Sequence, residues 1–137
     1  MRLKGKDIER LIPQRYPFVM VDEFEQCGDQ QAATALTVRG NNYFVISDGS
    51  MAETGVIEHI AQSCSALAGA KATDGKTPVG MIAEIKHFSI SRRPKAGERL
   101  ETTVTFGLSF GPMTLAHGST AIDGEPIAEA DLKIFIQ

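Results

Sequence analysis

Polar and apolar positions alternate through most of the second half of the chain. Between residues 100 and 110, apolar side chains or threonine fall at every second position, and similar patterns cover residues 79–91, 113–122 and the stretch after Gly124. The breaks between them contain Gly111-Pro112 and Asp123-Gly124, which are typical of tight turns. A period of two residues predicts four β-strands with one face on a core and the other in water.

The first half of the chain has a different pattern. Residues 6–11 form a short amphipathic segment that Pro13 should end, because the residue before a proline is disfavoured in helical conformation. The run 18–21 is apolar and predicts the start of a strand. Gly28-Asp29 then predicts a hairpin turn into a second strand at 32–38.

A long helix is predicted between these two halves. Ser50 is a candidate N-cap and Glu53 completes a capping box, so the helix should run to about Lys71. Its many small residues would let other backbone segments come close. Glu58, Gln62, Ser65 and Gly69 are spaced by four, three and four residues and therefore share one face.

The predicted order is short helix, two strands, long helix and four strands. An antiparallel sheet can bury one long apolar helix only by wrapping around it, which gives an α+β fold. The 137 residues contain no repeat, linker or low-complexity tract, so residues 1–137 are predicted to form one domain.

Composition narrows the class of protein. Hydrophobic residues make up 42% of the chain, charged residues 23%, and the net charge is −3, which is typical of a globular protein and disfavours nucleic-acid binding. No apolar run reaches membrane-spanning length, and no apolar region follows the basic N-terminus, so we expect a cytoplasmic protein without a membrane partner. Cys27 and Cys64 lack metal-ligand spacing, and no glycine-rich phosphate loop is present, so neither a metal nor another cofactor is expected.

Glu58 is the only acidic residue between Gly55 and Ala70. A carboxylate in an apolar setting is costly without a partner or a role, and burial there would raise its pKa, which suits a general acid. Gln62, one turn later, could hold the carboxylate by a hydrogen bond. The alternative is that Glu58 is a structural carboxylate.

Four motifs in order resemble the hotdog-fold 3-hydroxyacyl-ACP dehydratases of fatty-acid synthesis. They are Ile-Pro-Gln-Arg-Tyr-Pro-Phe at 12–18, Glu-His-Ile-Ala-Gln at 58–62, Arg-Arg-Pro-Lys-Ala-Gly-Glu at 92–98 and Ile-Asp-Gly-Glu-Pro-Ile-Ala-Glu-Ala at 122–130. Gln14 stands where the family motif has histidine. The resemblance implies a hotdog fold, an antiparallel sheet around one central helix, with Glu58 as catalytic acid and the acyl pocket between two subunits.

The chain departs from the family at the other catalytic position. The family carries a histidine in a loop before the helix, whereas residues 41–58 contain none. Counting forward from Asn41 places Asp48 at that position, whereas counting back from Glu58 places Phe44 there. Asp48 and His59 are therefore weaker candidates for contact with substrate, and His59 lies about 100° around the helix from Glu58. Gly55 could offer its backbone N–H to a thioester carbonyl, or could simply allow close packing.

The resemblance also implies partners. Acyl carrier protein (ACP) is acidic, and Arg92, Arg93 and Lys95 form the densest basic cluster in the chain, so they are candidate docking residues. We expect a homodimer acting on acyl thioesters as a dehydratase with a degenerate site. Two alternatives stay open: a hotdog thioesterase, or a non-catalytic subunit that completes a hetero-oligomer with an intact dehydratase.

Overall fold

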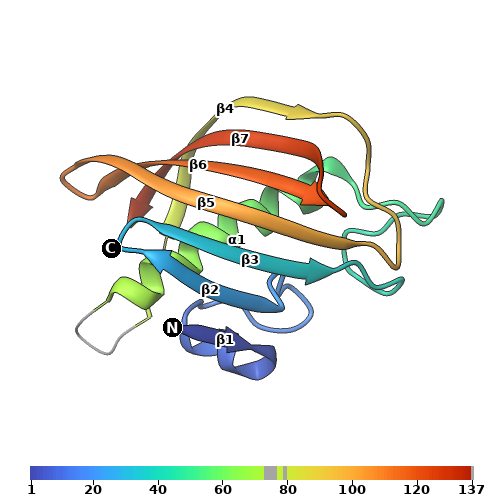
Figure 1. The fold of residues 1–137 in the computed structure, drawn as a ribbon, viewed down its shortest axis with the longest axis horizontal. Coiled ribbons are helices and arrows are strands. Elements are labelled where there is room, and N and C mark those ends of the chain that lie inside the picture. The colour runs from blue at the N-terminus through green and yellow to red at the C-terminus, as the bar shows by residue number, and fades with distance from the viewer. Residues whose placement is uncertain (73–76, 79, 137) are drawn as a thin grey trace.

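The central helix lies against one face of a single antiparallel sheet (Figure 1). The computed structural model describes residues 1–72, 77–78 and 80–136. Position 79, the predicted start of the strand pattern over 79–91, lies outside these residues. In the described chain the elements are β1 (Arg2–Lys4), the 3₁₀ helix η1 (Gly5–Arg10), β2 (Glu23–Gly28), β3 (Gln31–Thr37), α1 (Glu53–Lys71), β4 (Gly80–Ile90), β5 (Arg99–Phe110), β6 (Met113–Ile122) and β7 (Glu125–Ile136). The strand order across the sheet is β1-β2-β3-β5-β6-β7-β4.

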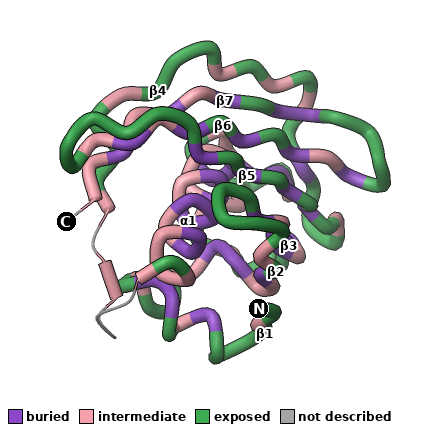
Figure 2. Tube along the Cα trace, turned by 60° about the vertical axis from the view of Figure 1, so that its left-hand side comes forward, coloured by how far each residue is buried: buried purple, intermediate pink, exposed green. Residues whose placement is uncertain are grey.

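The core forms between α1 and the sheet, and it follows the predicted alternation (Figure 2). On β5 the even-numbered residues Leu100, Thr102, Val104 and Phe106 are buried, and on β7 Ala128, Ala130, Leu132 and Ile134 are buried. Leu108 was predicted on the same face, but it is exposed. The pairing of β5 with β6 shifts register between Phe106 and Ser109, and this irregularity ends the alternation.

The strand predicted to start at Phe18 starts instead at Glu23. The backbone of the preceding segment bonds to side chains of α1 rather than to another strand. The Met20 N–H donates to Gln62, and the carbonyls of Phe18 and Met20 bond to Gln62 and His59. Because these groups are already satisfied by the helix, residues 18–21 fit against α1 without joining the sheet.

The predicted helix start was also wrong by a few residues. Helix α1 begins at Glu53 with Ala52 as its N-cap, and no side chain caps it. The Ser50 hydroxyl donates instead to Asp48, 2.6 Å away, and Glu53 forms an ion pair with Arg93 at 2.7 Å. The two residues of the expected capping box therefore have other partners: Ser50 bonds within the loop before the helix, and Glu53 pairs with the turn that contains Arg93. The helix ends at Lys71, as predicted.

Small residues let the backbone approach α1 closely. A Cβ atom built on Gly69 would lie 2.1 Å from the carbonyl oxygen of Leu11, and one built on Gly118 of β6 would lie 2.5 Å from Ile60 Cγ2. Both contacts exclude any larger residue. The segment after η1 therefore packs closely on the helix at Gly69, and strand β6 packs closely on it at Ile60.

Strand β4 lies at one edge of the sheet and pairs with β7 alone within the described chain. It has 11 residues, and its side chains are mostly exposed, including Met81, Ile82 and Ile85 (Figure 2). No described helix is both long and apolar enough to cross a membrane. The sheet therefore presents a long edge with exposed apolar side chains.

Candidate active site

Glu58 and Gln62 are brought together one turn apart on α1. Gln62 Nε2 donates to Glu58 Oε1 at 2.9 Å and also to the Phe18 carbonyl at 2.7 Å. Gln62 Oε1 accepts from the Met20 N–H at 2.7 Å, so the amide of this buried residue is fixed by three groups. The predicted support of Glu58 by Gln62 is present in the structure. Glu58 itself is half-buried, because this face of the helix is open rather than enclosed.

A cavity of about 290 Å³ adjoins this pair. Its walls come from three regions: the loop after η1, the Glu58 face of α1, and the edge formed by β4 and β7. The lining residues are Gln14, Glu58, Ala61, Gln62, Ser65, Gly80, Met81, Ile82 and Ile134. Glu58 is the one ionisable side chain among them. The cavity therefore combines a single carboxylate with amides, a hydroxyl and apolar walls.

His59 points away from this cavity into the core. It has no exposed surface, and its Nδ1 lies 2.6 Å from the Met20 carbonyl while Nε2 lies 2.8 Å from the Thr102 hydroxyl. A carbonyl can only accept, so Nδ1 carries the proton and neutral Nε2 accepts from Thr102. Burial lowers the pKa of His59 to about 4. His59 is thus a neutral core residue that does not line the cavity beside Glu58.

Gly55 and Asp48 do not line the Glu58 cavity. The Gly55 N–H donates to the Ala52 carbonyl at 2.8 Å, and a Cβ on Gly55 would lie 2.6 Å from Phe44 Cβ. Close packing therefore accounts for this glycine. Asp48 is exposed, and hydrogen bonds from the Ser50 side chain and backbone lower its pKa. It orders a turn rather than facing Glu58.

The basic cluster lies on the turn before β5, next to the start of α1. Arg92 donates both terminal nitrogens to Glu98 at 2.9 Å, and Arg93 pairs with Glu53 at 2.7 Å. The Arg92 guanidinium holds the pKa of Glu98 below its usual value. Lys95 is exposed and forms no ion pair with another described residue. Most of this positive charge is therefore neutralised within the chain.

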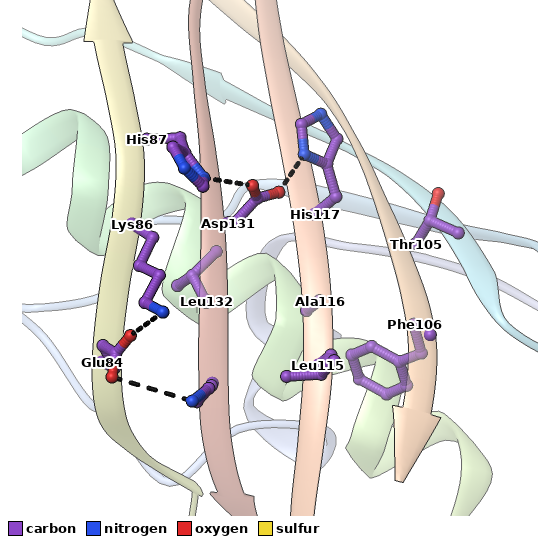
Figure 3. A pocket seen from close by; sticks show the side chains of 12 residues that line it. Glu84, Lys86, His87, Thr105, Phe106, Leu115, Ala116, His117, Asp131 and Leu132 are labelled. Atoms are coloured by element: carbon purple, nitrogen blue, oxygen red, sulfur yellow. Dashed lines mark hydrogen bonds and ion pairs between the residues drawn. The ribbon is translucent and has the colours of Figure 1, made fainter.

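A second cavity, of about 410 Å³, shares no lining residue with the first. It lies over β4, β5, β6 and β7, with α1 behind the sheet, and none of the predicted site residues contributes to it (Figure 3). Asp131 accepts hydrogen bonds from His87 at 2.9 Å and His117 at 2.6 Å. His87 and His117 occupy exposed positions of β4 and β6.

Two parts of the Glu58 cavity were missed from the sequence. Gln14 was noted only as a replacement for the family's histidine, yet its side chain forms part of the wall. That replacement was the available signal. The β4 edge, Gly80 to Ile82, adjoins residues that are fifteen or more positions earlier in the helix, and no local pattern predicts this contact.

Comparisons with known proteins agree on one family. A family model described as ApeP dehydratase, ApeP-like, matches residues 6–137. The 3-hydroxyacyl-[acyl-carrier-protein] dehydratase FabZ of Bacillus pumilus is 30% identical over 139 residues, which cover 98% of this chain and 96% of the relative. The enzyme of the same name from Halalkalibacterium halodurans is 27% identical over 143 residues, covering 96% and 97%. The resemblance read from the four motifs is confirmed.

Solved structures confirm the hotdog fold. The dehydratase heterocomplex ApeI:P from Xenorhabdus doucetiae superimposes with a TM-score of 0.84 at 17% identity, covering 98% of this chain and 91% of the other. A hypothetical thioesterase from Streptococcus pneumoniae, solved with coenzyme A, gives 0.69 at 11% identity and covers 96% and 95%. Dehydratases and thioesterases both use this fold, so the fold does not choose between the two activities.

Proposed function

Because this chain belongs to the ApeP-like dehydratase family, we propose that it supplies the acid half of a site that dehydrates 3-hydroxyacyl thioesters. Glu58 is the proposed acid, held by Gln62. The second catalytic group comes from a partner subunit. The chain is thus one component of an oligomeric dehydratase, either with a second copy of itself or with a histidine-bearing relative.

One observation carries this proposal: among the described residues that line the cavity, Glu58 is the one ionisable group. Removing water from a 3-hydroxyacyl chain needs a base for the C2 proton and an acid for the departing hydroxyl. His59 is in the core, with both nitrogens engaged, and Asp48 lies outside the cavity. The described chain therefore offers the acid and lacks an accessible histidine beside it.

The proposed reaction is a syn-type elimination. The base removes a proton from C2, the electrons of that bond form the C2–C3 double bond, and the C3–O bond breaks. The Glu58 carboxyl gives its proton to the leaving hydroxyl, which departs as water and leaves a 2-enoyl thioester. The hydrogen bond from Gln62 Nε2 to Oε1 orients the carboxyl throughout and leaves Oε2 for the substrate.

The position of β4 supports a partner subunit. An exposed edge strand with unpaired backbone groups and apolar side chains invites pairing with another strand. Gly80, Met81 and Ile82 of this edge are also walls of the Glu58 cavity. A subunit added along β4 would cover the apolar side chains and bring its own residues toward Glu58.

We also propose ACP as the carrier of the substrate, in the cytoplasm. Arg92 and Arg93 are already paired with Glu98, Glu125 and Glu53, so Lys95 is the best-placed cation of the turn for an acidic partner. We expect Lys95→Glu to raise KM for an ACP-linked substrate about 3- to 10-fold while leaving the CoA-linked substrate unchanged. Steady-state kinetics on both carriers test this.

The test of function is hydration of a crotonyl thioester, carried on CoA and on ACP. The protein is assayed alone and after co-expression with a histidine-bearing dehydratase of the same family. Loss of enoyl absorbance reports hydration, and a free-thiol assay reports hydrolysis. Glu58→Gln removes the acid, whereas Glu101→Gln makes the same change at an exposed residue of β5 outside the cavity.

We expect Glu58→Gln to lower hydration by about 100-fold or more, the range for loss of a general acid, with Glu101→Gln unchanged. Activity that requires the partner would identify it as the source of the base. Thiol release dependent on Glu58 would replace the proposal with the thioesterase. If wild type and Glu58→Gln have equal activity in every combination, the remaining hypothesis is that the chain is a non-catalytic subunit.

A further inference from the structure

His59 is a buried histidine with no part in the proposed chemistry, yet both of its ring nitrogens have a partner. Thr102 donates to Nε2, and the Thr102 hydroxyl in turn lies 2.7 Å from that of Thr120. A neutral imidazole has one donor and one acceptor nitrogen. Because Nε2 is the acceptor, the single N–H is at Nδ1 and points at the Met20 carbonyl, 2.6 Å away.

The residue that receives this hydrogen bond is also bonded to Gln62. The Met20 carbonyl accepts from His59, and the Met20 N–H donates to Gln62 Oε1 at 2.7 Å. The two helix side chains are three positions apart on α1, so they are neighbours that hold both backbone polar groups of one residue. Residues 18–21 precede β2 and pair with no strand of the described chain. The helix side chains therefore hold this backbone in place of a strand neighbour.

The Met20 N–H decides which end of the Gln62 amide faces Glu58. An amide group has a donor end and an acceptor end, and a backbone N–H bonds only to the acceptor. Because Met20 occupies Oε1, Nε2 is directed to the Phe18 carbonyl at 2.7 Å and to Glu58 Oε1 at 2.9 Å. A reversed amide would turn its oxygen toward two other acceptors and lose both bonds. The bond that aligns Glu58 therefore depends on the position of Met20.

We propose that His59 is a positioning residue of the dehydratase: by holding Met20 it fixes the Gln62 amide, which in turn keeps Glu58 aligned for proton transfer. This inference rests on the proposed function. His59 does not line the cavity, so its effect passes through hydrogen-bonded neighbours. An apolar side chain would fill the same core position but leave the Met20 carbonyl unpaired, and Met20 would then shift to find another donor. A small misalignment of a catalytic group is enough to slow the reaction.

The test uses two replacements that each retain one half of the imidazole. In His59→Asn the side-chain amide nitrogen lies near the position of Nδ1 and donates to Met20, whereas the bond with Thr102 is lost. In His59→Gln the amide lies near the position of Nε2 and keeps the bond with Thr102, whereas the Met20 carbonyl loses its donor. Both replacements are polar, and urea denaturation establishes that both are folded.

Two measurements follow the Gln62 amide and the chemistry separately. Protection of the Gln62 side-chain N–H groups from solvent exchange, measured by NMR on the full chain in the oligomer in which it purifies, needs no turnover. Hydration of the crotonyl thioester gives kcat in the assembly that is active. The control His117→Gln makes the same change at an exposed histidine of β6 and should alter neither quantity.

Wild type and His59→Asn should protect the Gln62 amide and agree in kcat within about 3-fold. In His59→Gln the amide should exchange about 10-fold faster, the size expected when one buried hydrogen bond is lost, and kcat should fall about 10-fold with KM unchanged. If His59→Gln does not fold, His59→Leu, which also offers Met20 no donor, is judged by the same two measurements.

A double-mutant cycle shows whether the effect passes through Gln62. Gln62→Met removes the amide, and Gln26→Met makes the same change on β2, away from the cavity. Because both variants disturb the same alignment, adding His59→Gln to Gln62→Met should lower kcat by less than about 2-fold, whereas adding it to Gln26→Met should give the full fall.

The outcomes separate this inference from the proposed function. A Gln62 amide that stays protected in His59→Gln overturns the inference, and so does lost protection with an unchanged kcat. An equal fall of kcat with and without the Gln62 amide also overturns it, because a general loss of stability produces that result. In these cases Glu58-dependent hydration by wild type leaves the dehydratase proposal standing. Absence of Glu58-dependent hydration in wild type overturns the proposed function, and this inference with it, whatever the Gln62 amide shows.

Discussion

Glu58 and His59 are neighbours in the chain, yet Glu58 lines a cavity whereas His59 lies in the buried core. The His59 ring lies in the core, where both of its nitrogens form hydrogen bonds. Its partner Thr102 also forms a hydrogen bond with the Thr120 hydroxyl, at 2.7 Å. Glu58 is half-buried beside a cavity, with one hydrogen bond from Gln62. One step along a helix turns a side chain by 100°, which is enough to separate the two regions.

The two regions differ in how completely their polar groups are paired. On the His59 face, Ser63 donates to the His59 carbonyl and its hydroxyl bonds that of Thr34 at 2.7 Å, so the described side chains named here all have partners. On the Glu58 face, Gln14 Oε1 lacks one. Complete pairing stabilises the fold and leaves nothing for a ligand. Incomplete pairing lowers stability and leaves acceptors available for chemistry.

Removing the His59 ring should have the largest effect on stability. His59→Ala leaves the Met20 carbonyl unpaired and opens a void in the core, so we expect a loss of about 3–4 kcal/mol in the free energy of unfolding. The matched variant His117→Ala removes an exposed ring bonded to Asp131 and should cost less than about 1 kcal/mol. Urea denaturation measures both. Similar losses in the two variants would contradict the contrast between the regions.

The pH dependence of stability should also report on His59. Its pKa is lowered to about 4 in the folded protein, against 6.5 as the ordinary value, because burial disfavours the charged ring. Unfolded His59 binds a proton below pH 6.5 while the folded ring does not, so stability is complete above pH 6.5 and falls as the pH drops toward 4. Over this range the loss should approach about 3 kcal/mol.

The carboxylates act at lower pH. Glu23, Glu53, Glu98 and Asp131 have lowered pKa values in the fold, so their contribution is present above their ordinary values near 4 and is lost below them. Between pH 6.5 and about 4.5 these carboxylates contribute little, and the difference between wild type and His59→Ala gives the part of the pH dependence that is due to His59. Imidazole resonances in NMR identify it directly: a His59 ring that titrates near 6.5 would contradict its burial in neutral form.

Most of the fold followed from the sequence because its signals are local. Alternation fixed the strands β5 to β7, and the lone carboxylate with Gln62 one turn later identified the pair that the structure joins. The segment 18–21 misled because its apolar run resembles a strand, while its backbone bonds to residues more than forty positions away. The cap at Ser50 failed for a local reason instead, since Asp48, two residues earlier, accepts the hydrogen bond of its hydroxyl.

The rest of the site depends on tertiary placement. Gln14 and the β4 edge reach the cavity through folding, and no spacing rule connects them to Glu58. His59 shows the reverse case: it is next to the acid in sequence, but the rotation of the helix takes it to the core. A sequence indicates which side chains can do chemistry more readily than which of them share a cavity.

Gln62 is buried and bonds the 18–20 segment, and it also lines the cavity and bonds Glu58. Its replacement therefore tests whether stability and activity depend on the same side chain. Gln62→Met leaves the Met20 N–H and the Phe18 carbonyl without a partner and releases Glu58. We expect a loss of about 2 kcal/mol in unfolding free energy and about a 10-fold fall in kcat. Denaturation and hydration kinetics are measured beside Gln26→Met. An unchanged kcat in a destabilised protein would show that Gln62 supports the loop without positioning the acid.

The smallest effect is expected at Asp131, where the bonds resemble those of His59 but water is close. Asp131 accepts from His87 and His117, and these bonds lower its pKa (Figure 3). The His87 side chain is 78% accessible, and those of His117 and Asp131 are 49% and 47% accessible, so solvent competes for both bonds. Asp131→Asn should therefore change the unfolding free energy by less than about 1 kcal/mol at pH 7. A loss as large as that of His59→Ala would mean that this outer surface is covered in the native assembly, since only exclusion of water makes such bonds matter.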